Sequence, residues 1–212
     1  MSRNPDDCFK YANSAKESER IPIPDTKSHI WFKEQKVSSS SDQKIISIPD
    51  RWVVGIKIGT SVPIFKQYDD KERYWIPKKE TLEEGLSVAF MRYEGDIRCG
   101  VPFTQVLLRD DYGFGFAGKF LLRIQNEGKF YDTFSAVGSE LKDYELANQY
   151  VRNLMISCLA SEFADLDKRE VSSSGLDMKI RNAINHSGRD NNLPSKLGLV
   201  VTNLVLESKK VA

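Results

Sequence analysis

The chain has 212 residues, with 31 Lys and Arg against 30 Asp and Glu, so its formal net charge is +1 with His neutral. This balance argues against the basic surface expected of a nucleic-acid-binding protein, and it equally excludes an acidic tail. Hydrophobic residues make up 40% of the chain, which is enough for a sizeable core at this length. The sequence is therefore typical of about one or two globular domains.

The three cysteines, Cys8, Cys99 and Cys158, are odd in number and far apart, and no C-x-x-C pair is present. A disulfide framework needs an even number of cysteines, and a zinc ribbon needs close pairs. We therefore expect three reduced thiols and a reducing, cytoplasmic compartment.

The sequence carries no pattern typical of membrane insertion. The first twenty residues lack the apolar region of a secretory signal, residue 2 is Ser rather than the Gly of a myristoylation site, and the last residues do not form a C-a-a-X box. The longest apolar stretches, at 114–124 and 197–206, fall well short of the about 20 residues of a membrane helix. We expect at most peripheral membrane contact.

Residues 1–44 are polar and contain three prolines and a run of four serines. Their apolar content is too low to offset the entropy lost on ordering. The pattern predicts a flexible polar arm that is dispensable for folding, with the aromatic pair Trp31 and Phe32 as its one anchor.

From residue 45 onward, short runs rich in β-branched and aromatic residues alternate with turn residues such as Gly59–Ser61 and Asp69–Lys71. The runs lie at 51–58, 62–66, 73–77, 86–93, 103–109 and 114–124. This succession predicts strands in antiparallel meanders rather than alternating βαβ units.

Helical spacing begins after Ile124 and predicts about three helices. The first has apolar residues at 130, 134 and 137, and the third, after Ser172–Ser174, has them at 176, 180 and 184. The second covers Asp143–Leu166, and its predicted apolar stripe is Ala147, Val151, Leu154, Cys158 and Phe163, flanked by Tyr150, Met155 and Leu159. We expect Leu154 in the core and Arg152 at the surface.

The last segment, Leu197–Ser208, is almost entirely apolar until Glu207. Such a run predicts a strand of about eight residues that is central in its sheet or covered on both faces. The resulting fold class is α+β, with a strand-rich N-terminal half, about three helices and a closing strand. We expect one such domain over residues 45–212, behind the arm at 1–44.

Gly113, Gly115 and Gly118 satisfy the pattern G-x-G-x-x-G. In a dinucleotide-binding unit these glycines open a helix, and the helix N-terminus binds the pyrophosphate. Here residues 119–124 are typical of a strand, and the chain lacks the H-R-D and D-F-G motifs of a kinase. We expect the glycines to permit close backbone approach or a bulge. A small nucleotide-handling enzyme that uses residues 113–118 is the alternative.

The remaining reactive residue types do not form a recognisable motif. Ser139 lacks the G-x-S-x-G frame, His29 lies in the predicted arm, and His186 lies at a predicted helix end. The other candidates are the carboxylate pairs 110–111 and 165/167 and the basic pairs 78–79 and 209–210. The carboxylates are typical of turns, and the basic pairs are too short for a lipid or nucleic-acid site. We predict no catalytic, cofactor-binding or metal-binding residues.

A further signal comes from five segments between Gly95 and Lys210. They are Pro102–Val106 with Asp111–Gly113 ("P..F.D..YG"), Phe116–Ile124 ("..G.Y..RI"), Asn126–Phe130 ("DP..F"), Tyr150–Leu166 ("LR..I...L...L") and Leu197–Leu206 ("LGI.V..V.I"). In this order they resemble the SPFH (band-7/stomatin–prohibitin–flotillin) domain, and most of all its bacterial cytosolic virion-core-protein-like branch.

This resemblance implies a non-catalytic scaffold or protein-interaction domain, often associated with membranes, with a protein partner or weak self-association. Two features depart from the family pattern. Asn126–Glu127 replaces the DP pair, and the sequence ends at Ala212, where members usually continue into a long helix that builds rings or coiled coils. We therefore expect a monomer or dimer.

Overall fold

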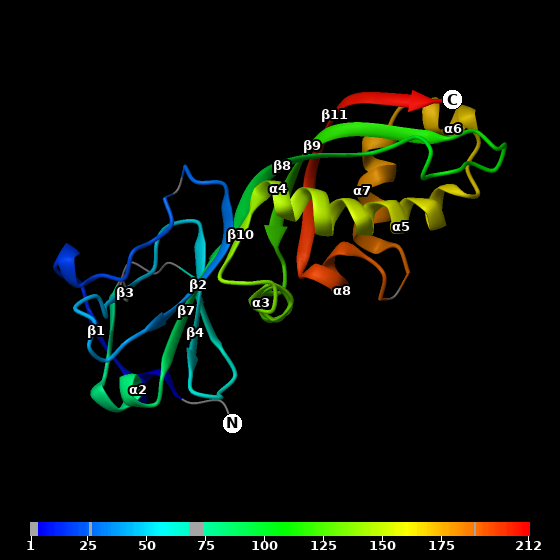
Figure 1. Ribbon diagram of the computed structural model, residues 1–212. Helices are drawn as coiled ribbons and strands as arrows, with labels where there is room; N and C mark the ends of the chain where they lie inside the picture. The colour runs from blue at the N-terminus through cyan, green and yellow to red at the C-terminus, as the bar shows by residue number, and fades with distance from the viewer. Residues whose placement is uncertain (1–3, 26, 68–73, 189) are drawn as a thin grey trace. The chain divides into compact units, whose positions relative to one another are not determined.

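The structure is a computed structural model that describes residues 4–25, 27–67, 74–188 and 190–212. The chain forms two compact units: unit 1 contains Met1–Tyr93 and Phe134–Leu141, and unit 2 contains Glu94–Thr133 and Lys142–Ala212. Antiparallel strand pairs and helices make up the fold, and a long strand closes the chain (Figure 1). The predicted α+β class is confirmed.

Unit 1 contains two sheets. The larger has the order β10 (Glu140–Lys142), β2 (Ile30–Val37), β7 (Leu86–Arg92), β4 (Trp52–Ile58) and β5 (Ile64–Gln67). The smaller has the order β1 (Phe9–Ala12), β6 (Tyr74–Pro77) and β3 (Ile46–Ser47). Three short helical segments, α1 (Pro5–Cys8), η1 (Glu17–Glu19) and α2 (Lys79–Glu83), lie in the connections.

One buried cluster of unit 1 is formed by one face of the larger sheet together with the smaller sheet. Val54 pairs with Phe90 and Ile56 pairs with Val88 between β4 and β7, so these four side chains share a face. They belong to one buried cluster with Trp75 of β6. Cross-strand packing of branched and aromatic side chains explains why these runs form strands.

The prediction of a flexible arm over residues 1–44 is wrong. β1 pairs with β6, and β2 pairs with β7 from Phe32 to Val37. Trp31 and Phe32 are completely buried. A few apolar residues suffice here, because pairing with β7 also satisfies backbone groups of β2. The predicted single domain over 45–212 is also wrong, because residues 45–93 lie in the same unit as the arm.

The strands predicted at 51–58, 62–66, 73–77, 86–93 and 114–124 are confirmed as β4, β5, β6, β7 and β9 (Phe114–Ile124). The strand predicted at 103–109 is wrong, because this segment is a loop with an isolated bridge from Leu107 to Gly113. β8 (Glu94–Val101) is absent from the predicted strands, since five of its eight positions are polar or glycine. The predicted turn at Asp69–Lys71 lies outside the described residues.

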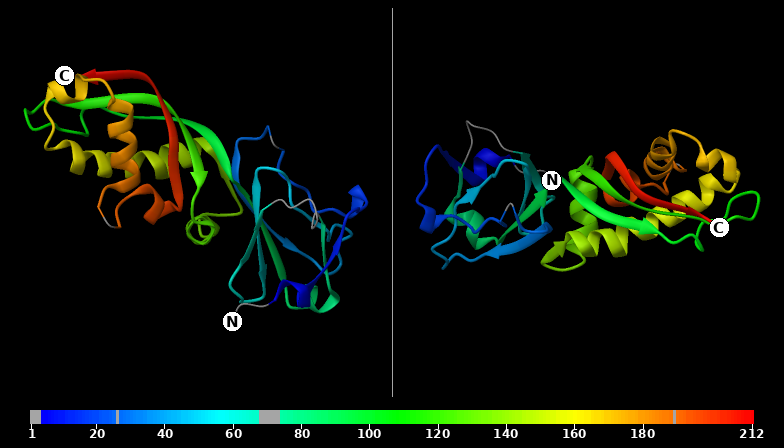
Figure 2. Two further views of the ribbon diagram at one scale, coloured as in Figure 1. Left: turned by 180° about the vertical axis from the view of Figure 1, so that it is seen from behind. Right: turned by 90° about the horizontal axis from the view of Figure 1, so that it is seen from above.

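Unit 2 places helices on one face of a three-stranded sheet with the order β11 (Leu199–Val211), β9 and β8 (Figures 1 and 2). The helical segments in this part of the chain are α3 (Glu127–Ser135), α4 (Asp143–Glu145), η2 (Leu146–Val151), α5 (Arg152–Phe163), α6 (Lys168–Ser172), α7 (Leu176–His186) and α8 (Leu193–Leu197). α7 packs against β11, and α5 packs against both α7 and β8.

β11 differs from its prediction in length and position. It has 13 residues, and within the described part of the chain its one strand partner is β9, so it is an edge strand rather than a central one. Its buried positions, Leu199, Val201 and Leu204, face the helices, whereas Val205 is 55% exposed. The apolar run therefore marks a strand covered on one face, with some apolar side chains left at the surface.

The long predicted helix over Asp143–Leu166 is present but irregular. Its segment η2 is π-helical, and the N–H of Arg152 bonds the carbonyl oxygen of Ala147, five residues back. The extra residue in this turn shifts the buried face of the following helix by one position. Met155 and Leu159 are therefore completely buried, while Leu154 is only half-buried. Arg152 is half-buried rather than exposed. The predicted core position of Leu154 is thus corrected to Met155.

The two other predicted helices are confirmed as α3 and α7. In α7, Leu176, Ile180 and Ile184 are buried as their spacing by four predicts. Its N-cap is Gly175, in a left-handed conformation, rather than one of the preceding serines. α3 ends at Ser135, so Val137 lies outside the helix and is 44% exposed.

Candidate functional site

The glycines of the G-x-G-x-x-G motif pack against backbone. Gly115 and Gly118 lie within β9, and a Cβ atom at Gly115 would collide with the backbone nitrogen of Phe103. A Cβ atom at Gly118 would lie 2.8 Å from the carbonyl oxygen of Val205. The space beside the glycines is therefore filled by loop 102–113 and β11. The sequence predicts this close approach, and it differs from the open helix start that binds phosphates.

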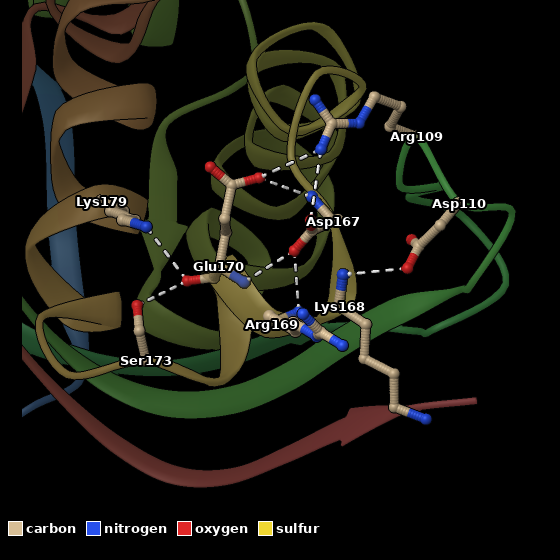
Figure 3. Close-up of polar contacts among 8 residues, drawn as sticks. All are labelled: Arg109, Asp110, Asp167, Lys168, Arg169, Glu170, Ser173 and Lys179. Carbon is tan, nitrogen blue, oxygen red and sulfur yellow. Dashed lines mark hydrogen bonds and ion pairs between the residues drawn. The ribbon is translucent and has the colours of Figure 1, made fainter.

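A cluster of charged contacts joins loop 102–113 to the start of α6 (Figure 3). Nη2 of Arg109 donates to Oδ2 of Asp167 at 3.2 Å and lies 3.8 Å from Oε2 of Glu170. Oδ2 of Asp110 accepts a hydrogen bond from the backbone N–H of Lys168 at 3.1 Å. We call this set the loop–α6 cluster, and it brings together residues 58 positions apart in sequence.

Asp167 has a second role as the N-cap of α6. Its Oδ1 accepts from the backbone N–H groups of Arg169 and Glu170 at 2.9 and 3.0 Å. In return, Oε2 of Glu170 accepts from the N–H of Asp167 at 2.8 Å, which completes a capping box. The hydrogen bond from the Glu170 backbone, together with smaller effects of Arg169 and Arg109, holds the pKa of the Asp167 carboxyl below its usual value.

The loop–α6 cluster extends to α7 through the backbone of Glu170. Its carbonyl oxygen accepts from Nζ of Lys179 at 3.0 Å and from Oγ of Ser173 at 2.7 Å (Figure 3). General acid–base chemistry requires a carboxylate within hydrogen-bond reach of a substrate proton. Here the carboxylates of Asp167 and Glu170 already accept from backbone N–H groups and Arg109. The cluster is therefore suited to holding loop 102–113 in place.

Two residues of this cluster, Asp110 and Asp167, belong to the carboxylate pairs that stand out in the sequence. For the adjacent pair 110–111 the sequence indicates only a turn. The spacing of Asp167 and Glu170 is that of a capping box, which is a readable signal for a helix start. Arg109, in contrast, sits at the end of a run that resembled a strand, and nothing in its neighbourhood indicates a partner in α6.

The predicted free thiols are confirmed, and all three are buried. Sγ of Cys99 lies 3.5 Å from Sδ of Met155, and burial raises the pKa of Cys99 to about 12. Burial also raises the pKa of Cys158 to about 11, and its thiol bonds the carbonyl oxygen of Asn191 at 3.1 Å. Because the thiolate is the reactive form, the raised pKa values disfavour nucleophilic reactions of Cys99 and Cys158 near neutral pH.

His186 borders two open pockets of unit 2. One has a volume of about 360 Å³ and includes Phe163, and the other has a volume of about 490 Å³ and includes Asn185 and Asn192. Both amides already serve the fold. Asn185 bonds the N–H and carbonyl oxygen of Val201, each at 2.9 Å, and Asn192 caps α8. The polar side chains that line these pockets are therefore already bonded to backbone groups of β11 and α8.

The other residues singled out from the sequence do not come together. Ser139 and His29 belong to unit 1, whereas His186 belongs to unit 2. The carbonyl oxygen of Ser139 accepts from the N–H of Glu34 at 2.8 Å, and Nζ of Lys78 donates to the carbonyl oxygens of residues 6 and 7. These groups make contacts that organise unit 1.

Across residues 4–25, 27–67, 74–188 and 190–212, no group of three or more His, Cys, Asp or Glu side chains could hold a metal ion. In the same residues, no helix is both long and apolar enough to span a membrane. Neither a protein-family model nor a curated protein matches the chain.

Proposed function

We propose that the chain is a non-catalytic scaffold or protein-interaction protein whose unit 2 is an SPFH-like domain. The observation that carries this proposal is the order of elements in unit 2. β9 is followed by α3, then by the long helix of η2 and α5, and finally by β11. Four of the five segments that resemble the family occupy these elements in the same order, and the first lies in loop 102–113.

The pairing of β11 with β9 adds support. The two strands run antiparallel from Leu199 opposite Ile124 to Val211 opposite Phe114. Two segments of the resemblance that are more than seventy positions apart, roughly half a typical domain length, thus lie side by side in one sheet. If these segments form one domain, their strands should share a sheet that is covered by their helices.

The proposal includes a cytoplasmic location, a protein partner or a second copy, and at most peripheral contact with membranes. The free, buried thiols agree with a reducing compartment. The near-neutral net charge offers little attraction to anionic lipids or nucleic acid.

The alternative, a nucleotide-handling enzyme that uses residues 113–118, receives no support from the geometry. Phosphate binding needs backbone N–H groups that face an open space, usually at a helix N-terminus. At Gly115 that space is occupied by the backbone of Phe103 and Val101.

Thermal unfolding with added ligands tests the proposal against this alternative. We expect ATP–Mg²⁺ and common phosphorylated metabolites to produce no saturable rise in Tm. In a parallel arm, the tagged chain purified from its native cells should retain a protein partner, or an untagged copy of itself, in constant ratio. A saturable rise in Tm accompanied by turnover would contradict the scaffold role.

Lys119 provides the matched control for the ligand arm. Its side chain is half exposed, pairs with Asp96 at 2.7 Å and directly follows the glycine motif. This lysine is adjacent in sequence to Gly118, the last glycine of the motif. Lys119→Ala places no new atom in the packed space, so loss of a ligand-induced shift in this variant would assign the ligand to the glycine motif.

A further inference from the structure

Among the residues that the structure describes, no strand pairs with the outer edge of β11, because the sheet order is β11, β9, β8. Gly113 and Ala212 exchange both backbone hydrogen bonds, and this fixes which residues of β11 face β9. Counting back along the antiparallel register, the N–H and C=O groups of Val211, Lys209 and Leu206 point away from β9.

The first half of this edge is closed by side chains. Asn185 of α7 bonds both backbone groups of Val201, and Arg181 of α7 donates to the carbonyl oxygen of Thr202 at 3.1 Å. The N–H of Leu204 donates to Oδ1 of Asn203 at 2.9 Å. These contacts occupy the outward backbone groups with which another strand would pair here.

The second half of the edge is open. Residues 207–210 are all exposed. Among the described residues, no hydrogen bond reaches the outward backbone groups of Leu206, Lys209 or Val211. The strand is nevertheless held in an extended conformation up to Ala212 by its bonds to Gly113. A preformed strand edge loses little conformational entropy when it pairs.

We propose that residues 205–211 of β11 pair antiparallel with the same residues of a second copy, which joins two three-stranded sheets into one across a twofold axis. This inference deepens the proposed scaffold role, on which it rests for the choice of a second copy as partner. The sequence Val-Leu-Glu-Ser-Lys-Lys-Val is self-complementary in charge only when the two strands run in opposite directions.

The charge argument holds for the register that the outward backbone groups select. The register shift between Leu206 and Ser208 leaves Glu207 without a Cα partner in β9, so Leu206, Lys209 and Val211 lie opposite alternate residues of β9. A twofold axis at Lys209 then pairs Leu206 with Val211 of the second copy and places Glu207 beside its Lys210. Parallel in-register pairing would place Glu207 opposite itself. Opposite charges across neighbouring strands stabilise a pair, and like charges destabilise it.

The same residues explain why the edge does not recruit strands indiscriminately. Lysines on an exposed edge normally oppose pairing. Here Lys210 can meet a glutamate only on a strand of matching sequence and opposite direction. The interface involves a short edge, well below the about 1,200 Å² of a standard stable complex, so we expect dissociation constants in the micromolar range or above.

Sedimentation of the full chain between about 1 and 500 µM tests the proposal, since this range spans the weak dissociation constants expected of a small interface. Wild type should shift from monomer to dimer. E207K and the double variant K209E/K210E each place like charges across the axis, and each should raise the dissociation constant about tenfold or more, the equivalent of about 1.4 kcal/mol. An equimolar mixture of the two should restore association, because opposite charges then face each other.

Two further variants separate backbone pairing from charge. K209P removes an outward N–H without touching the bonds to β9, and it should abolish the dimer. K209A keeps that N–H and should weaken association less. Unchanged circular dichroism and Tm verify folding, and Glu207 is expected to tolerate replacement because its 3.3 Å ion pair with Arg98 is exposed.

Several outcomes would overturn the inference. They are a wild type that stays monomeric at the highest concentration, charge variants that associate like wild type, a mixture that remains monomeric, and a K209P variant that still dimerises. Each would leave the proposed function standing if a different protein is retained in constant ratio on purification, whereas nucleotide turnover would remove the proposed function without affecting the dimer measurement.

Discussion

Asp167 combines two contacts in one carboxylate, since Oδ1 caps α6 and Oδ2 binds Arg109 of loop 102–113. Asp167→Ala removes both contacts and should lower the urea midpoint of unit 2. Asp167→Asn keeps a cap acceptor but loses the charge, so it should lower the midpoint less. Circular dichroism at 222 nm follows the helices and measures the difference, and an Asn variant as unstable as the Ala variant would contradict this division of roles.

The lowered pKa of Asp167 gives this contact a definite pH dependence. The folded-state pKa lies below that of the unfolded chain, near about 3.9 for an ordinary Asp. The stabilisation is therefore complete above that value and is lost as the pH falls through the folded-state pKa. We expect the difference in urea midpoint between wild type and Asp167→Asn to shrink from pH 7 to pH 3. A difference in midpoint that stays constant with pH would show that the charge of Asp167 does not contribute to stability.

Position 115 requires glycine, because the backbone of Val101 and Phe103 occupies the place where a side chain would begin. Gly115→Ala places a methyl group against Phe103 and Val101 and should destabilise unit 2 by about 1–3 kcal/mol, as over-packing typically does. The matched control is Ala117→Gly in the same strand, where the half-buried methyl is removed and about 0.5–1 kcal/mol should be lost. Urea titrations of both variants compare the two effects. A Gly115→Ala variant as stable as wild type would show that loop 102–113 moves aside without penalty.

At the scale of elements, the π-helical turn in η2 determines which residues of α5 reach the core. Met155 is completely buried and contacts Cys99, whereas Leu154 is half-buried. Met155→Ala should therefore lower the free energy of unfolding by about 2–5 kcal/mol. Leu154→Ala removes a similar number of atoms from a more exposed site and should lose distinctly less. Equal losses in urea titration would indicate that α5 is rotated from the orientation described.

The elements that sequence reasoning predicts well are those with a single consistent pattern. β4, β7 and β9 are continuous branched and aromatic runs, and α7 repeats an apolar residue every four positions. β2 and β8 mix polar and apolar residues. β2 depends for its pairing on β7, which is distant in sequence, and β8 depends on β9, which follows loop 102–113. The η2 turn depends on a choice between two backbone hydrogen-bond patterns, which side-chain periodicity does not record.

The candidate site divides in the same way. The Asp167–Glu170 capping box is a local pattern and can be read from the sequence. The contact of Arg109 with Asp167 spans 58 positions and requires loop 102–113 to be placed first. The close packing at Gly115 is an intermediate case. Glycines within a strand predict that another segment packs closely against them, but they do not identify that segment.

At the scale of the whole molecule, the aromatic probes are distributed unevenly between the units. The chain has three tryptophans, Trp31, Trp52 and Trp75, and all are buried in unit 1. The two longest α-helices, α5 and α7, lie in unit 2. Tryptophan fluorescence therefore follows the unfolding of unit 1, while circular dichroism at 222 nm chiefly follows that of unit 2.

This distribution leads to a prediction about cooperativity. Each unit has a sheet and a core of its own, so we expect each to unfold as its own cooperative unit. Met155→Ala should lower the midpoint seen by circular dichroism and leave the fluorescence midpoint nearly unchanged. Val88→Ala, in the core of unit 1, should do the reverse. Coincident shifts of both probes in both variants would instead establish one two-state transition for the entire chain.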